Sequence, residues 1–213
     1  MAEGLGTGIP AAPVRKGDGM KDVFSVCVYC GSSSRVSDTY KDAAHQLGTL
    51  LGQKGHQLVY GGGRVGLMGI VADATLAAGG SVVGIIPEHI QVLEVEHTGL
   101  TELLVVDSMH TRKRMMVDRS DAFVVLPGGL GTLDETFEIL TWKQLRLHDK
   151  PIVVANVDGY WNALEELLDH MIAQGFAQPA HRKLFTVVNR VEDVLPALSA
   201  EPEPVISPDT KWL

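Results

Sequence analysis

Glycine-rich turns, together with a few charged residues near them, are the parts of this sequence whose spacing suggests chemistry. Three apolar runs end in such turns: YCGSSS (29–34), YGGGRVG (60–66) and PGGLGT (127–132). Backbone N–H groups that no side chain obstructs, at the start of a helix, can hold an anion such as a phosphate. Because parallel strands bring their carboxyl ends to one edge of a sheet, we expect the three turns to surround one crevice.

The charged candidates are Arg112 and Lys113 in SMHTRKRMM and Glu135 in GTLDE. The net charge of -8 disfavours a general nucleic-acid binder, so a local basic cluster must hold any anionic ligand. Arg112 follows the apolar run ELLVV closely, although a basic helix face is more often simply solvated. Glu135 also has a structural interpretation, because residues 132–135 (TLDE) fit a capping box in which Thr132 caps a helix and Glu135 bonds back to it. The spacing leaves both interpretations open.

Other motifs in the sequence are incomplete. GGGRVG fits the dinucleotide pattern GxGxxG, but it follows the second apolar run, and no acidic residue ends the next run, SVVGII. A phosphate-binding GK[ST] ending is absent. Cys27 and Cys30 form a CxxC match on an expected strand, where positions three apart point to opposite faces, which favours two unpaired thiols. The eight histidines show no spacing typical of metal ligands, so we expect no metal site.

The elements that must position these residues alternate along the chain. Nearly continuous apolar runs indicate strands buried on both faces, and amphipathic segments between them indicate helices. The expected strands are 23–29, 56–60, 81–86, 102–106, 122–126, 151–157 and 186–188, and the expected helices are 38–54, 65–78, 110–119, 132–147 and 160–174. This order predicts an α/β fold of the Rossmann-like, doubly wound type, with a mostly parallel sheet of about six or seven strands and helices on both faces.

The chain is expected to form a single domain over residues 22–198. Its ends, 1–21 and 199–213, are rich in Gly, Pro or acidic residues and are predicted to be disordered tails. No apolar stretch is long enough to cross a membrane or to serve as a signal peptide. We therefore expect a cytoplasmic, soluble protein without a membrane partner.

The segments YGGGRVGLMG, SMHTRK and PGGLGTLDE together resemble the LOG ("Lonely guy") family of cytokinin riboside 5′-monophosphate phosphoribohydrolases, over about residues 22–198. The resemblance implies a homodimer that hydrolyses the N-glycosidic bond of adenosine 5′-monophosphate, N6-prenylated or plain, to free base and ribose 5-phosphate. It implies no cofactor, no metal and no nucleic-acid partner. The substrate would be a nucleoside 5′-monophosphate.

The resemblance also assigns site residues. It implies catalytic roles for Arg112 and Glu135: a carboxylate near C1′ stabilises an oxocarbenium-like sugar, and the arginine serves either the leaving base or the phosphate. Met109, Met115 or Trp142 would line an apolar pocket for a prenyl group. The positions that the resemblance implies for substrate binding are Glu94, Arg112, Lys113, Gly129, Leu130, Gly131, Thr132, Leu133, Asp134, Glu135 and Thr141.

Two other functions stay open at this point. A non-catalytic nucleotide-binding or carrier protein could keep the same fold and glycines, although it would not need both Arg112 and Glu135. A lysine decarboxylase would need a lysine that forms a Schiff base with pyridoxal phosphate, and nothing in the sequence marks one.

Overall fold

The computed structural model describes residues 24–91, 97 and 99–200. The two expected tails, apart from residues 199 and 200, and the predicted substrate residue Glu94 lie outside the described residues. Among the described residues, every helix is too short or too polar to traverse a lipid bilayer.

Seven parallel strands form one sheet in the described part of the chain, in the order β4-β3-β2-β1-β5-β6-β7. Their bounds are β1 Ser25–Tyr29, β2 Gln57–Tyr60, β3 Ser81–Pro87, β4 Glu102–Val106, β5 Ala122–Val125, β6 Ile152–Ala155 and β7 Thr186–Val188. The predicted doubly wound parallel sheet is thereby confirmed. Strand order reverses between β1 and β5, and in folds of this type ligands bind outside the carboxyl ends of the strands at that reversal.

Burial on both faces explains why these short apolar runs are strands. In β1, Val26 and Val28 pack into one core cluster, while Cys27 and Tyr29 pack into the cluster on the other side of the sheet. All four are at most 2% exposed. The cysteines of the CVYC match, Cys27 and Cys30, belong to opposite clusters and are unpaired, as predicted.

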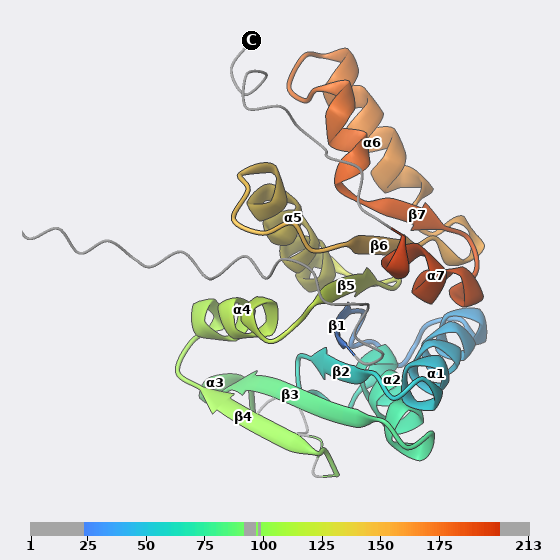
Figure 1. Ribbon diagram of the computed structural model, residues 1–213, viewed down its shortest axis with the longest axis vertical. Coiled ribbons are helices and arrows are strands. Elements are labelled where there is room, and N and C mark those ends of the chain that lie inside the picture. The colour runs from blue at the N-terminus through green and yellow to red at the C-terminus, as the bar shows by residue number, and fades with distance from the viewer. Residues whose placement is uncertain (1–23, 92–96, 98, 201–213) are drawn as a thin grey trace, which may run out of the picture.

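Helices cover both faces of the sheet (Figure 1). Buried residues of α1 (Asp38–Gln53), α2 (Gly66–Ala77) and α7 (Val194–Ser199) join the cluster on one face. Those of α4 (Met109–Asp118), α5 (Leu130–Gln144) and α6 (Asn162–Ala173) join the cluster on the other. The short helices are α3 (Glu88–Gln91), η1 (Val157–Gly159), η2 (Pro179–Leu184) and η3 (Val191–Asp193).

Two glycines inside α1 allow this helix to lie very close to α2. A Cβ atom at Gly52 would lie 2.5 Å from the carbonyl oxygen of Thr75, and one at Gly48 would collide with the carbonyl of Val71. Glycine normally weakens a helix interior, so its presence here is explained by packing. The close contact fixes α2, whose first turn carries part of the glycine loop after β2.

Candidate active site

The three glycine turns meet at the carboxyl edge of the sheet, as the sequence predicted. Gly31 N–H donates to the carbonyl of Pro127 over 3.0 Å, and Leu67 N–H donates to the carbonyl of Gly31 over 3.0 Å. Gly66 has a φ of 69° and lies against the backbone of Ser32, where a Cβ atom would come within 2.5 Å of the Ser32 carbonyl oxygen. The loops after β1, β2 and β5 therefore form one contiguous surface.

The start of α5 is open on one side. Gly128 is packed against Thr132, but a Cβ atom at Gly129 or Gly131 would meet nothing within 4 Å. Gly129 is the N-cap residue and no side chain caps the helix, whereas serine side chains cap α1 and α4. The N-cap residue thus supplies no side-chain acceptor to the first N–H groups of α5, and the space beside both glycines is free among the described residues, an arrangement that suits a phosphate.

The capping-box interpretation of residues 132–135 is wrong. The helix begins at Leu130, two residues earlier than predicted, so Thr132 is its third residue and Glu135 its sixth. A capping box would need the acid at the third helical position. The preference for a Ser, Thr, Asp or Asn N-cap predicted the wrong first residue for this helix. Gly129 is the N-cap instead, and a glycine allows the helix to begin without a side-chain hydrogen bond. Glu135 is therefore not a capping residue of this helix.

Glu135 is half-buried, and its charge acts on the end of β1. Burial raises the pKa of the Cys27 and Cys30 thiols far above the ordinary value, and the negative charge of Glu135 raises both further. The positive charge of Arg112 lowers the pKa of Cys27, but by less than burial and Glu135 raise it. The two predicted catalytic charges thus lie close to the same strand, next to the reversal of strand order.

Arg112 is a buried residue and does not belong to a solvated helix face. Its side chain, on a residue only 7% exposed, donates from Nη2 to the carbonyl of Gly61 over 3.0 Å and from Nη1 to the sulfur of Met109 over 3.7 Å. A Cβ atom at Gly61 would overlap the guanidinium, so this glycine makes room for Arg112. Among the described residues, no partner accepts a hydrogen bond from Arg112 Nε. A buried cation with an unused donor is costly without a ligand and well suited to receive one.

Unlike Arg112, Lys113 is paired with acidic side chains of α5, and Thr141 is remote from the glycine loops. The ammonium group of Lys113 contacts Asp134 and Glu138 of α5, each at 3.1 Å. Thr141 is exposed and lies about 16 Å along α5 from Leu130 at 1.5 Å per residue. Within one chain the structure therefore brings together Arg112, Glu135 and the glycine loops, but it does not bring Thr141 to them.

Sequence reasoning missed two residues that hold the loops in place. The hydroxyl of Tyr160 donates to the carbonyl of Gly128 over 2.6 Å, and its ring meets Tyr40 edge-on at 5.4 Å. The backbone N–H of His97, which is buried, donates to the carbonyl of Gly62 over 3.3 Å. The only available signal for Tyr160 was its position shortly after a strand end, and His97 had none.

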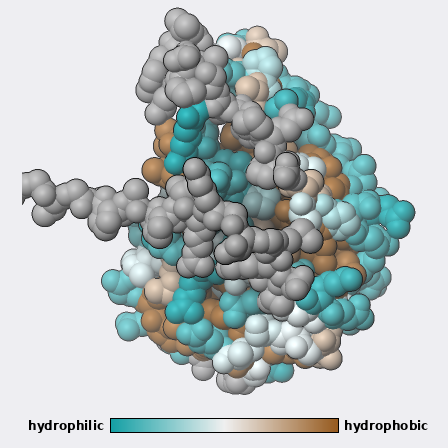
Figure 2. Space-filling view, viewed as in Figure 1, coloured by the Kyte–Doolittle hydropathy of each residue, from teal (hydrophilic) through white to brown (hydrophobic). Residues whose placement is uncertain are grey.

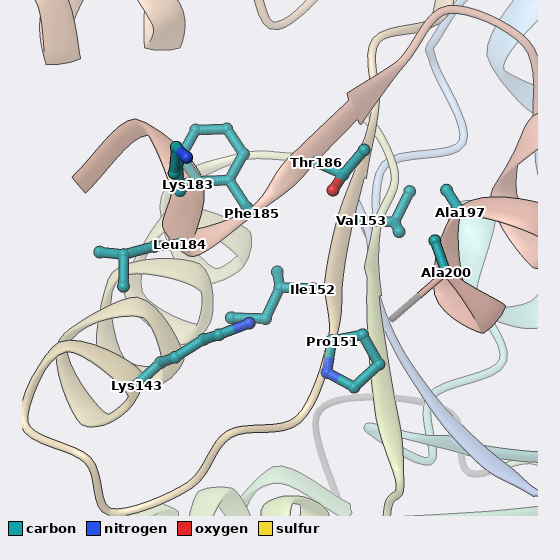
Figure 3. A pocket seen from close by; sticks show the side chains of 10 residues that line it. All are labelled: Lys143, Pro151, Ile152, Val153, Lys183, Leu184, Phe185, Thr186, Ala197 and Ala200. Carbon is teal, nitrogen blue, oxygen red and sulfur yellow. The ribbon is translucent and has the colours of Figure 1, made fainter. Parts of the chain in front are cut away.

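A small cavity elsewhere in the molecule is distinct from this site. It has a volume of about 70 Å³ and lies between α5, η2 and the first residues of β6 and β7, with Lys143, Ile152 and Thr186 in its wall (Figure 3). This is the amino edge of the sheet, opposite to the glycine loops. In the part of the chain that the structure describes, His, Cys, Asp and Glu side chains nowhere gather in threes as a metal site requires.

The fold is that of a Rossmann-like α/β protein, and the site lies at the reversal of strand order, where proteins of this architecture generally bind ligands. Solved structures of the same architecture include a molybdenum cofactor binding protein from Rippkaea orientalis (TM-score 0.62, 20% identity, covering 84% of this chain and 96% of that one). Another is the Moco carrier protein from Chlamydomonas reinhardtii (TM-score 0.61, 19% identity, 81% and 93% covered). At such identities the likeness concerns the fold alone.

Sequence relatives identify the family. A family model described as "Possible lysine decarboxylase" matches residues 68–198. A protein of Oryza sativa subsp. japonica named probable cytokinin riboside 5′-monophosphate phosphoribohydrolase LOGL9 is 47% identical, with 80% of this chain and 78% of the relative aligned. Proteins named cytokinin riboside 5′-monophosphate phosphoribohydrolase are 42% identical in Arabidopsis thaliana (LOG1; 80% and 84% aligned) and 44% identical in Rhodococcoides fascians (82% and 88%). The chain belongs to this LOG family.

Proposed function

We propose that the protein hydrolyses the N-glycosidic bond of adenosine 5′-monophosphates, N6-prenylated ones included, and releases the free base and ribose 5-phosphate. The observation that carries the proposal is the placement of a buried arginine and a half-buried glutamate beside β1, next to the open start of α5. Membership of the family and the names of its curated members point to the same reaction.

The segment from Gly129 to Thr132 would hold the 5′-phosphate. Gly129 at the N-cap supplies no side-chain acceptor to the N–H groups at the start of α5, and the positive end of the helix dipole adds to their attraction for an anion. Gly129 and Gly131 leave the space that a phosphate needs to approach the backbone. The net charge of the chain is -8, so this local attraction is what overcomes the general repulsion of an anionic substrate.

Glu135 would act at the sugar. As the bond between C1′ and the purine nitrogen breaks, its electron pair moves to the base and positive charge develops on the ribose. A carboxylate nearby stabilises that charge and orients the water molecule that adds to C1′, whose proton finally resides on the base or the solvent. The half-buried position of Glu135 strengthens this electrostatic effect compared with that of an exposed carboxylate.

Arg112 would stabilise the negative charge of either the departing base or the phosphate. Its guanidinium is fixed by Gly61 and Met109, and Nε has no partner among the described residues. Met109, beside the guanidinium, would form one wall of an apolar pocket for a prenyl group. Such pockets discriminate by about 1–3 kcal/mol per methylene, so a prenyl group that filled this pocket would favour prenylated substrates over plain AMP.

The same proposal includes a cytoplasmic homodimer. Partly exposed apolar side chains of α5 and its following loop, including Phe137, Leu145 and Leu147, offer a surface for a second copy. Figure 2 shows hydrophobic residues reaching the surface at the edge of the molecule where α5 lies. Thr141, remote from its own glycine loop, would reach a substrate only across such an interface. The two unpaired thiols suit a reducing compartment.

Sedimentation tests the dimer. We expect a species of twice 22.9 kDa at micromolar concentration. Phe137→Asp should shift it toward the monomer, because a buried charge at the interface lacks a partner. A wild type that sediments as a monomer throughout this range would remove both the dimer and the proposed role of Thr141.

Replacement of Glu135 by glutamine tests the catalytic role. Glu135 is not the N-cap residue of α5, and Glu135→Gln keeps the size of the side chain while removing its negative charge. We expect base release from AMP and isopentenyl-AMP to fall about 10²- to 10³-fold, with little change in melting temperature. Base release is measured by chromatography and AMP binding by calorimetry.

The outcomes separate the proposed hydrolase from the alternatives. A wild type that binds AMP without releasing base would be a nucleotide-binding or carrier protein. An unchanged rate in Glu135→Gln would leave the hydrolase without this acid. A lysine decarboxylase would show the absorbance of a pyridoxal phosphate aldimine in the purified protein, which we expect to be absent.

A further inference from the structure

Lys113 forms an ion-pair cluster between the two helices that carry the proposed catalytic residues. Its ammonium group on α4 lies 3.1 Å from a carboxylate oxygen of Asp134 and 3.1 Å from one of Glu138, both on α5. The side chain of Lys113 is 13% exposed and that of Glu138 is 23% exposed. This shielding from water strengthens the contact with Glu138 compared with an ordinary surface ion pair, whereas the side chain of Asp134 is 60% exposed and its contact is the weaker of the two.

Two members of the ion-pair cluster are direct sequence neighbours of the proposed catalytic residues. Lys113 follows Arg112 directly on α4, and Asp134 precedes Glu135 directly on α5. Asp134 and Glu138 are one helical turn apart, so both carboxylates lie on the same side of α5 and converge on one cation. A shift of either helix that broke the cluster would therefore also move Arg112 relative to Glu135.

We propose that Lys113 is a positioning residue that holds α4 and α5 at the separation required for Arg112 and Glu135 to act on the same substrate. This role deepens the proposed hydrolase function and rests on it. It differs from the substrate contact that the resemblance implied for Lys113.

Electrostatics favour the positioning role over direct contact with the substrate phosphate. Burial lowers the pKa of Lys113, but the hydrogen bonds that its ammonium group donates to Asp134 and Glu138, together with their negative charges, outweigh this and raise the pKa overall, so the residue stays charged. A phosphate that withdrew the ammonium group would leave two carboxylates, four residues apart, without their shared cation. Like charges at this spacing repel one another. The lysine is thus already engaged by the protein.

The test compares four variants with the wild type. Lys113→Met removes the cation, and Lys113→Arg keeps it. The double variant Asp134→Asn with Glu138→Gln removes the carboxylates while leaving Lys113 in place. The matched control is Arg119→Met, which removes one positive charge and one ion pair, to Glu102 at 2.9 Å, from the other end of α4. For each, kcat and KM for AMP, inhibition by ribose 5-phosphate and the melting temperature are measured.

We expect Lys113→Met and the double variant to lower kcat about tenfold or more, because small misplacements of reacting groups are costly, while KM changes less than about twofold. Lys113→Arg should retain most of the activity, and Arg119→Met should match the wild type. If Lys113→Met does not fold, the double variant and Lys113→Arg still provide the comparison.

Two results would overturn the positioning role while leaving the hydrolase intact. In the first, Lys113→Met and Arg119→Met behave alike. In the second, Lys113→Met raises KM and weakens inhibition by ribose 5-phosphate, while the double variant binds substrate as well as the wild type or better, which would make Lys113 a phosphate ligand. A wild type that releases no base from AMP would instead refute the proposed function, and the positioning role with it.

Discussion

Arg112 could be selected from the sequence as a candidate site residue, but its burial could not be predicted from the sequence. Its position after a strand was predicted from sequence, yet a basic stretch such as TRKR suggested a solvated helix face just as well. Burial comes from long-range partners: Gly61 lies 51 positions earlier, and only the folded chain brings its carbonyl to the guanidinium. The same limit applies to Lys113, whose carboxylate partners belong to another helix.

Tyr160 leads to a prediction for one hydrogen bond. Tyr160→Phe removes the hydroxyl that donates to Gly128 and keeps the ring that packs on Tyr40 and Trp161. A hydrogen bond of this kind contributes about 0.5–1.5 kcal/mol, so we expect KM for AMP to rise roughly two- to tenfold with kcat nearly unchanged. Steady-state kinetics provide the measurement. Tyr40→Phe is the matched control, and an equal effect from both variants would argue against a specific role for the Gly128 bond.

At the scale of elements, the sequence was sufficient where one local rule governs the outcome. Apolar runs buried on both faces predicted the seven strands, and glycine turns at their ends predicted one shared edge. The start of α5 was mispredicted because Thr132 obeys the usual preference for an N-cap while Gly129 takes that position. Nothing local distinguishes the two: the open space beside Gly129 and the packing of Gly128 on Thr132 depend on neighbouring loops.

Replacement of two helix glycines by alanine is predicted to change the stability of the fold in opposite directions. Gly48→Ala places a methyl group against α2 and should destabilise the fold by about 1–3 kcal/mol, although alanine is the better helix former. Gly131→Ala meets no neighbour and should leave stability equal or raise it by up to about 1 kcal/mol, while it hinders phosphate approach. Urea unfolding measures both. Equal changes in the two variants would show that helix propensity, not packing, decides the outcome.

At the scale of the whole molecule, the buried His56 and the half-buried His148 make stability depend on pH. Burial lowers the pKa of His148 and of His56 in the folded protein. His148 Nε2 donates to the carbonyl of Ile139 over 2.9 Å, and Nδ1 of the same ring is buried without a partner among the described residues. A proton on Nδ1 would have no acceptor there, so the folded state favours the neutral ring.

The sign of the pH dependence follows from this preference. The unfolded chain takes up protons on these histidines near pH 6.5, and the folded chain does so only at lower pH. Their contribution to stability is therefore present above about pH 6.5 and declines as the pH falls toward the lowered folded-state pKa. Urea unfolding at pH 7.5, 6.0 and 5.0 should show this decline, and His148→Gln, which can still donate to Ile139, should make it shallower. A variant with the same slope as the wild type would exclude His148 as a cause.

The reversal of strand order between β1 and β5 divides the sheet into a half from the earlier part of the chain and a half from the later part. A nucleotide bound there would touch loops of both halves, from Gly61 after β2 to Gly129 after β5. It would act as a bridge, and opening either half would require its release. Amide hydrogen exchange in the bound protein should consequently slow across β2, β1, β5 and β6 together, well beyond the loops that contact the ligand.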